Sequence, residues 1–290
     1  MINPVPRIAA IHDLSGFGRS SLTVVIPILS TLGVQVCPLP TALLSTHTSE
    51  FTGYHLRDLT ADMEGIIRHW KELKIEFDGI YSGYLGSPAQ IRIVADFIRD
   101  FRKENQLVVI DPVMGDDGKP YSAMEPALIS GMKDLIGSAD IITPNLTEAA
   151  FLLDTEYRDE ISIREIKDWA SALAEKGPST VIITSVPLPD DRDSTSVVAL
   201  DKKTGRFWQV KCAYVPAYFP GTGDIFTSVI CGSLLQGDSL PIAMDRAVQF
   251  VSLAIRASFG HEFPLREGVL LERVLNSLRA PVTSSGYQLL

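Results

Sequence analysis

The stretch whose residue types could do chemistry is FPGTGDIF, residues 219–226, which stands directly before a run with helical composition. Gly221 and Gly223 permit positive φ and a close approach of the backbone to a ligand. The first amides of the following helix lack intrahelical partners, and the helix dipole favours negative charge there. Gly221, Thr222 and Gly223 can therefore cradle an anion, while Asp224 receives a proton from a hydroxyl. The residues alone leave a plain capped turn equally open.

Further polar clusters follow runs that are expected to be strands. HDLSGFGRSS follows residues 7–12, DPVMGDDGK follows 107–111, TPNLTE follows 140–143, and Ser185 follows 180–184. Each cluster is weak evidence by itself, because strands end in turns and turns are polar. In a parallel sheet, however, all of these ends lie at one edge, where ligands collect. The sequence therefore predicts one long cleft.

Known phosphate-binding and metal-binding signatures are missing from these clusters. GFGRSS lacks the third glycine of a dinucleotide fingerprint, and no GxxxxGK[ST] motif occurs in the chain. The five histidines show no metal-ligand spacing, and satisfied packing is the expected state of His47. A nicotinamide enzyme, a P-loop enzyme and a histidine-based metal site are therefore not indicated.

The elements that must position these clusters alternate along the chain. Apolar, β-branched runs recur at 7–12, 34–39, 79–83, 107–111, 140–144 and 180–184. Amphipathic stretches such as 91–103 and 163–177 lie between them and predict helices. Near-continuous apolar strands that alternate with helices indicate a parallel sheet covered on both faces.

The last third of the chain follows a different pattern. Residues 196–210 form two runs around a Lys-Thr-Gly turn, which predicts an antiparallel hairpin at the sheet edge. Three helices are expected near 225–236, 240–259 and 267–278, and the last residues, APVTSSGYQLL, are expected to be loosely held. The prediction is a three-layer α/β/α sandwich with a mostly parallel central sheet and an antiparallel edge hairpin, in a single domain over residues 1–290.

Composition limits the classes of partner and compartment. The net charge of the 290 residues is −9 without a basic block, which argues against nucleic-acid and membrane partners. Cys37, Cys212 and Cys231 are far apart, as expected of free thiols in a reducing compartment. No signal peptide or membrane-spanning run is visible, so a cytoplasmic protein is expected.

Several motifs together resemble the ribokinase superfamily. These are GTGD at 221–224, DPVMGDDG at 111–118 and TPNLTE at 143–148. Two further segments, STHT at 45–48 and SGYLG at 82–86, resemble its vitamin B6 kinase branch, the pyridoxal, pyridoxine and pyridoxamine kinases. The similarity runs in the same order over about residues 7–260, and the set is far more specific than GTGD alone.

The resemblance implies a ribokinase-like fold and an activity. The activity is ATP-dependent phosphorylation of the 5′-hydroxymethyl group of pyridoxal, pyridoxamine or pyridoxine. Asp224 would be the base, and Gly221, Thr222 and Gly223 would form the anion hole for the phosphoryl group. Mg²⁺ would be held through water by Asp111 and Glu148; family members also use K⁺ and form homodimers.

The resemblance also implies the residues that bind the two substrates. Along the nucleotide it places Asp116, Thr143, Asn145, Thr184, Ser185 and Phe226, the last with the region 210–219 beside the adenine. Around the vitamin it places Asp13 or Ser15, Leu44, His47, Thr48 and Tyr84. Residues 116–123 would form a flap that closes over the site and carries Tyr121.

Two departures keep other functions open. The loop IHDLSG at 11–16 is closer to that of hydroxymethylpyrimidine kinases, where Asp13 would suit an aminopyrimidine or pyridoxamine. Tyr121 stands where some relatives have a flap cysteine, so no aldehyde adduct is expected. The alternatives are a hydroxymethylpyrimidine kinase of thiamine synthesis, a non-catalytic B6- or nucleotide-binding protein, and a sugar kinase. The acidic residues Asp111, Glu148 and Asp224 argue against a mere binder.

Overall fold

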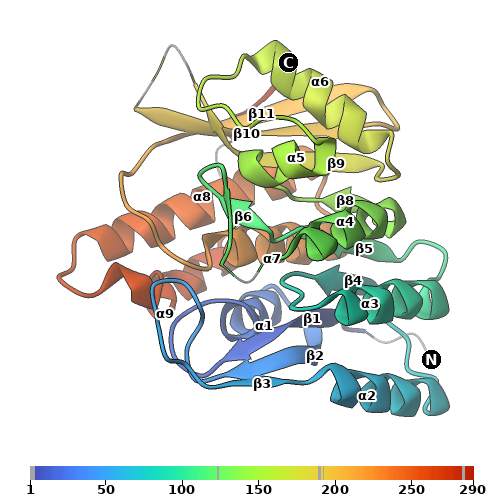
Figure 1. The fold of residues 1–290 in the computed structure, drawn as a ribbon. Coiled ribbons are helices and arrows are strands. Elements are labelled where there is room, and N and C mark those ends of the chain that lie inside the picture. Colours follow the sequence, from blue (N-terminus) through green and yellow to red (C-terminus); the bar gives the residue numbers. More distant parts are fainter. Residues whose placement is uncertain (1–3, 123, 189–190, 192, 283–284) are drawn as a thin grey trace.

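The sheet at the centre of the molecule has ten strands in the order β12-β11-β10-β9-β8-β5-β4-β1-β2-β3 (Figure 1). The computed structural model describes residues 4–122, 124–188, 191, 193–282 and 285–290. The central strands are parallel: β1 (Arg7–Ser15), β2 (Gln35–Leu44), β4 (Gly79–Ser82), β5 (Leu107–Ile110), β8 (Ile141–Ile142) and β9 (Thr180–Pro187). Antiparallel strands complete both edges: β3 (Leu56–Asp58), β10 (Ser194–Asp201), β11 (Arg206–Ala213) and β12 (Tyr287–Leu289).

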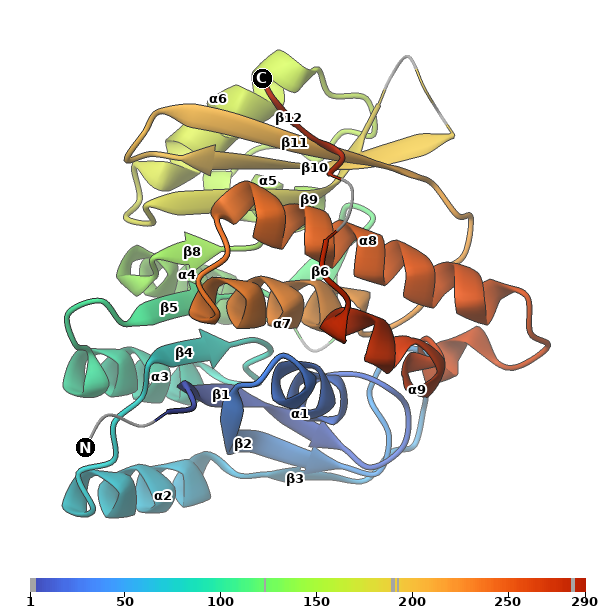
Figure 2. The ribbon, with the colours of Figure 1, turned by 180° about the vertical axis from the view of Figure 1, so that it is seen from behind.

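Helices cover both faces of this sheet. One layer contains α2 (Thr60–Glu72), α3 (Pro88–Phe101), α4 (Pro126–Leu135), α5 (Leu146–Leu153) and α6 (Ile163–Ala174). Figure 2 shows the other layer: α1 (Leu22–Thr31), α7 (Thr222–Leu235), α8 (Leu240–Phe259) and α9 (Leu271–Val274). Successive residues of β1 are buried in alternate cores, Ala9 and Ile11 in one and Ile8 and Ala10 in the other. The predicted three-layer sandwich and its edge hairpin are confirmed.

The C-terminal part differs from the prediction. Tyr287–Leu289 is not loosely held, because it pairs with β11 and the amide of Gly286 donates to Asp245 Oδ1 at 3.1 Å. Residues 283–284 of the predicted tail lie outside the described part. The helix expected at 267–278 is broken into α9 between 3₁₀ turns at Leu265–Glu267 and Leu275–Arg279. Gly268 has φ of 80°, a conformation that an α-helix cannot include.

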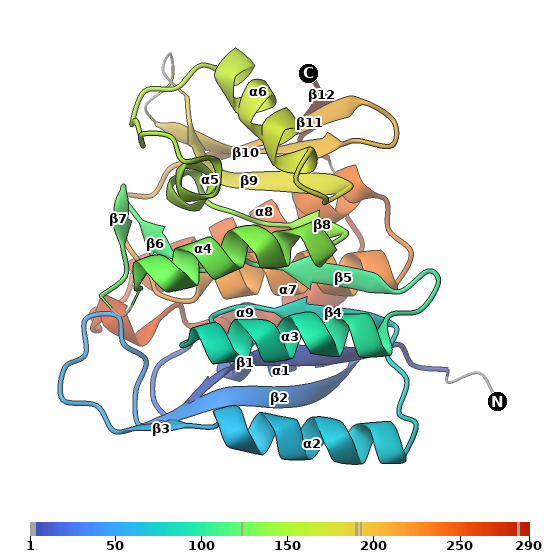
Figure 3. The same ribbon diagram turned by 45° about the vertical axis from the view of Figure 1, so that its right-hand side comes forward.

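The parallel strands bring the predicted clusters to one edge of the sheet. The strand order reverses between β1, which continues to β2, and β4, which continues to β5, and such a switch point opens a crevice. A separate hairpin of β6 (Gly115–Asp116) and β7 (Lys119–Pro120) stands beside this region (Figure 3). It overlaps the predicted flap 116–123, of which Ala123 is outside the described residues. No helix of the described residues has the length and apolarity to cross a bilayer.

Candidate functional site

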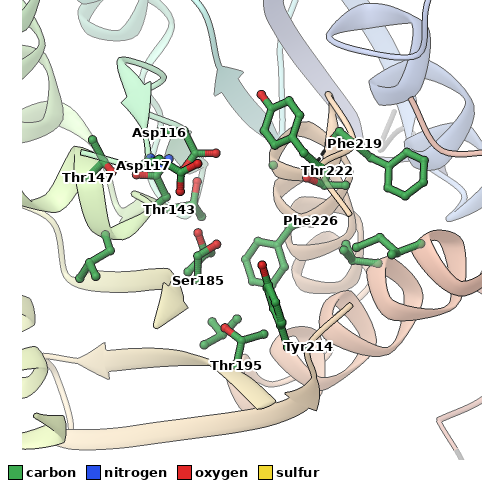
Figure 4. Close-up of a pocket in the computed structure, with 18 of the residues that line it drawn as sticks. Asp116, Asp117, Thr143, Thr147, Ser185, Thr195, Tyr214, Phe219, Thr222 and Phe226 are labelled. Carbon is green, nitrogen blue, oxygen red and sulfur yellow. Dashed lines mark hydrogen bonds between the residues drawn. The ribbon is translucent and has the colours of Figure 1, made fainter. Parts of the chain in front are cut away.

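A cavity of about 1090 Å³ lies at this edge of the sheet. Figure 4 shows Asp116 and Thr143 on one side, opposite Thr222 and Phe226 from α7, with Tyr214 at the β10–β11 end. The cavity brings together most of the predicted site residues, namely Tyr84, Asp111, Asp116, Tyr121, Thr143, Asn145, Glu148, Thr184, Ser185, Gly221, Thr222, Gly223, Asp224 and Phe226. Their roles in binding and catalysis stay predictions.

The helix start that carries GTGD is built as an anion cradle requires. α7 begins at Thr222, and its N-cap residue, Gly221, has φ of 83°. No side chain caps this helix: Asp224 instead accepts a hydrogen bond at Oδ2 from the amide of Ser21, at 2.8 Å. The turn capped by Asp224, which the residues alone left open, is therefore absent. Thr222 and Gly223 line the cavity, so the first turn of the helix borders the space where a ligand would sit.

Asp13 and Ser15 lie behind the cavity wall rather than on it. Both are buried, and neither lines the cavity. Asp13 accepts hydrogen bonds from the Ser21 hydroxyl at 2.6 Å and from the Ser15 hydroxyl at 3.1 Å. Ser21 does line the cavity and also holds Asp224 through its amide. Asp13 thus reaches the site through one intervening residue.

Leu44, His47 and Thr48, which were also predicted to contact the vitamin, are likewise outside the cavity lining, whereas Tyr84 is part of it. His47 is buried, with Nε2 at 2.7 Å from the carbonyl of Arg266 and Nδ1 accepting from the amide of Ser49 at 3.2 Å. This pair of contacts places the proton on Nε2 and gives the ring a packing role. Leu44 is buried at the end of β2, and Thr48 is exposed.

The buried Asp111 and Glu148 and the partly buried Asp224 line the same cavity and have raised pKa values. Burial raises the pKa of Asp224 to about 7, assisted by the nearby Asp13 charge and opposed by the Ser21 amide. Burial, and then the charge of Asp224, raises the pKa of Asp111, although the hydroxyls of Thr143 and Thr227 donate to it. The pKa of Glu148 is raised well above its usual value by burial and then by Asp111.

Glu148 also has a structural task that the sequence analysis missed. Asn145 and Glu148 form a capping box at the start of α5, with the Glu148 Oε2 accepting from the Asn145 amide at 2.8 Å. Glu148 Oε1 accepts from the Met114 amide at 3.1 Å, and the Asn145 side-chain amide donates to the Gly115 carbonyl at 2.8 Å. The two residues therefore anchor the flap hairpin to α5. The N-x-x-E spacing was the available signal.

Several cavity residues were not predicted individually. They include Ser21, Tyr157, Thr195, Tyr214, Tyr218 and Thr227, of which Tyr214 and Tyr218 lie in the predicted region 210–219. Thr227 lies 2.9 Å from the hydroxyl of Thr143 and 3.5 Å from Asp111 Oδ2. It follows Asp224 by three positions on α7, which places both on the same helix face, and this spacing could have identified it.

The charged side chains that line the cavity, among the described residues, are acidic. Its acidic residues are Asp111, Asp116, Asp117, Glu148, Asp159, Glu160 and Asp224, and the described lining residues include no lysine or arginine. An isolated polyphosphate would be repelled by such a wall. Any phosphate ligand must therefore arrive with cations, or rely on backbone amides such as those of α7.

The comparisons with known proteins agree on one family. The family model described as phosphomethylpyrimidine kinase matches residues 26–268. A crystal form with pyridoxal of a Bacteroides thetaiotaomicron protein, provisionally described as a phosphomethylpyrimidine kinase, is 55% identical with a TM-score of 0.96 and covers 99% of this chain and 100% of that one. Pyridoxal kinase from Lactobacillus plantarum is 30% identical with a TM-score of 0.86, covering 94% and 96%. Pyridoxal kinase from Arabidopsis thaliana is 30% identical over 259 residues, 84% of this chain and 79% of that protein.

Proposed function

The chain belongs to the phosphomethylpyrimidine kinase family, and we propose that it transfers the γ-phosphoryl group of ATP to the 5′-hydroxymethyl group of pyridoxal, pyridoxamine or pyridoxine. The observation that carries this proposal is the placement of Asp224. Its carboxylate lies in the first turn of α7, beside the uncapped amides of that helix and at the wall of a cavity large enough for two small ligands. The relatives named as pyridoxal kinases, and the relative with bound pyridoxal, support the choice of substrate.

We assign each group a part in the proposed transfer. The substrate hydroxyl oxygen attacks the γ-phosphorus, the bond to the β-phosphate oxygen breaks, and the hydroxyl proton goes to Asp224. Gly221, Thr222 and Gly223 offer backbone amides to the oxygens of the transferring group. Phosphoryl transfer has a loose transition state, so positioning and charge neutralisation matter more than a strong base. Asp116, Thr143, Asn145, Thr184, Ser185 and Phe226 line the side proposed for ATP.

The acidic wall fits the proposed Mg²⁺. Mg²⁺ prefers one or two carboxylates together with water and phosphate oxygens, and it neutralises the charge that develops on the phosphates. Asp111 and Glu148 are buried carboxyl groups whose pKa values are raised by burial and by nearby carboxylates, which a divalent cation would relieve. The described residues contain no group of three or more His, Cys, Asp or Glu arranged as a metal cage. We therefore propose that the phosphates supply much of the coordination.

The substrate assignment is tested by measuring ADP release from MgATP with K⁺ present. Separate reactions contain pyridoxal, pyridoxamine, pyridoxine or hydroxymethylpyrimidine. We expect release with at least one B6 vitamer and its loss in Asp224→Asn. Release with hydroxymethylpyrimidine alone would instead indicate a kinase of thiamine synthesis. Asp13 and the description of the family model are the two observations in favour of this alternative. If folded protein releases no ADP with any of the four compounds, the result would favour a non-catalytic binding protein.

The cation proposal predicts a large effect on nucleotide affinity. Because the wall is acidic, removal of Mg²⁺ with EDTA should weaken ATP binding by at least about tenfold in isothermal titration calorimetry. Asp111→Asn should raise the Mg²⁺ concentration for half-maximal turnover by about tenfold, whereas the control Asp238→Asn, outside the cavity, should change it little. Equal ATP affinity with and without Mg²⁺ would contradict the proposal.

Three further parts of the proposal need their own measurements. A single domain is proposed because strands from residue 7 to residue 289 join one sheet, and it predicts one calorimetric unfolding transition. A homodimer is proposed from the family resemblance, and light scattering tests it by measuring whether the mass in solution is that of two chains. K⁺ activation is proposed on the same ground and is measured by replacing K⁺ with a quaternary ammonium ion.

A further inference from the structure

His12 is a polar side chain whose burial the fold alone does not explain. It lies in β1, is 0% exposed, and packs edge-on against Tyr81 with ring centroids 4.3 Å apart. Neither Nδ1 nor Nε2 has a hydrogen-bond partner among the described residues, and both atoms are buried. A neutral imidazole always carries one N–H, and a buried donor without an acceptor destabilises a protein. An apolar residue would fill the same space without this penalty.

The ring is directed at the carboxylate of Asp224. His12 Nδ1 lies 3.8 Å from Asp224 Oδ1, while Asp224 Oδ2 is already held by the Ser21 amide at 2.8 Å. Gly83 also approaches the ring closely, because a Cβ atom there would lie 2.3 Å from Nδ1. His12 and Ser21 thus flank the two oxygens of the same carboxylate.

The contact is not an ion pair. Complete burial lowers the pKa of His12 to about 3, so the imidazole is neutral at any pH suited to an assay, despite its nearness to a carboxylate. A ring that resists protonation cannot take the substrate proton onward from Asp224. What it can do is donate its single N–H. The gap closes to a hydrogen bond with a shift of under about 1 Å, and such bonds often tighten only in the reacting complex.

We propose that His12 is a positioning residue for Asp224, with its proton on Nδ1 and donated to Asp224 Oδ1. Together with the Ser21 amide at Oδ2, this bond fixes the plane of the carboxylate relative to the amides of α7. Each carboxylate oxygen has two lone pairs, so Asp224 remains able to accept the substrate proton. His12 does not line the cavity and acts only through Asp224. The inference rests on the proposed kinase function.

The test uses two substitutions of equal shape. Asparagine and leucine have the same branching, so His12→Asn and His12→Leu leave the same space, but only asparagine keeps an N–H near the Nδ1 position. We expect kcat of His12→Leu to be about 10- to 100-fold below that of His12→Asn, with similar KM values for ATP and vitamer. A structural role predicts the opposite order, because leucine should be the more stable buried residue. Equal kcat values, or a difference confined to KM, would overturn the inference.

A second pair of measurements keeps the inference testable if either variant misfolds or if the wild-type protein releases no ADP in the assay. His12→Phe keeps the ring against Tyr81 without a donor, and its kcat should fall as that of His12→Leu does. Ring ¹⁵N spectra of the wild-type protein, assigned by loss of the His12 signal in a variant, should show Nδ1 protonated and shifted in Asp224→Asn. Protonation on Nε2 would overturn the inference whatever the activity. Silence of the wild-type protein with every vitamer would instead count against the proposed function.

Discussion

Replacement of Asp224 by asparagine is expected to lower kcat by about 10²- to 10⁴-fold, the range for loss of a positioned general base, without unfolding the protein. Asparagine keeps an oxygen to accept the Ser21 amide, so the carboxylate's 2.8 Å contact has a neutral replacement. What it cannot do is take the proton of the substrate hydroxyl. The measurement is ADP release at saturating ATP and vitamer.

The same substitution is expected to stabilise the protein at alkaline pH. Burial raises the folded-state pKa of Asp224 from 3.8 to about 7, so ionisation increasingly destabilises the folded state as pH rises between these values. Its side chain is 14% exposed and therefore partly solvated, so we expect ionised Asp224 to lower the free energy of unfolding by about 1–3 kcal/mol. At pH 8, Asp224→Asn should therefore raise the unfolding midpoint by several degrees, and at pH 4 the gain should vanish.

Two outcomes would contradict this account of Asp224. A kcat within about tenfold of wild type would remove Asp224 as the base. A lower unfolding midpoint at pH 8 would show that the ionised carboxylate is needed for the fold. The matched control is Asp238→Asn, since Asp238 is outside the cavity and pairs with Arg246 at 3.3 Å; it should leave kcat unchanged.

The fold could be predicted from the sequence where burial dictates composition. β1, β5 and β9 are covered on both faces, so they read as near-continuous apolar runs. β12 could not be found in this way, because Tyr287–Leu289 is an edge strand with largely exposed side chains and no periodic signal. Its pairing with β11 is a long-range contact that local composition does not encode.

The site could be predicted where it depends on strand ends and could not where it depends on loop paths. Asp111 and Thr143 directly follow the parallel strands β5 and β8, and Thr184 lies in β9, so sheet topology alone brings them to the cavity. His47 lies in a loop whose course is set by the Arg266 carbonyl, 219 positions away. No role was predicted for His12, because the sequence cannot show that its ring faces the carboxylate of Asp224.

Gly221→Ala is expected to damage stability and turnover together, because the position admits no Cβ atom. Its φ is 83°, and an added Cβ would lie 2.3 Å from the Arg19 carbonyl oxygen and 3.1 Å from Ser20 Cα. These are backbone atoms, which cannot rotate away as a flexible side chain can. We expect the free energy of unfolding to fall by about 2–4 kcal/mol, measured by urea unfolding.

Gly221→Ala should also lower turnover, because the added Cβ atom would separate the backbone of residues 19–21 from the start of α7. Arg19 and Ser20 lead directly to Ser21, whose amide holds Asp224, while Gly221 starts the helix that carries Asp224. Separating the two segments should misplace both the base and the proposed anion hole and lower kcat by at least about 100-fold.

Gly237→Ala, just beyond the other end of α7, is the matched control: its φ is 92°, yet a Cβ there would meet nothing within 4 Å. Gly237→Ala should cost about 1 kcal/mol and leave kcat unchanged. Equal losses in both variants would mean that backbone conformation alone, and not the close packing of residues 19–21 against the GTGD turn, explains the glycine at position 221.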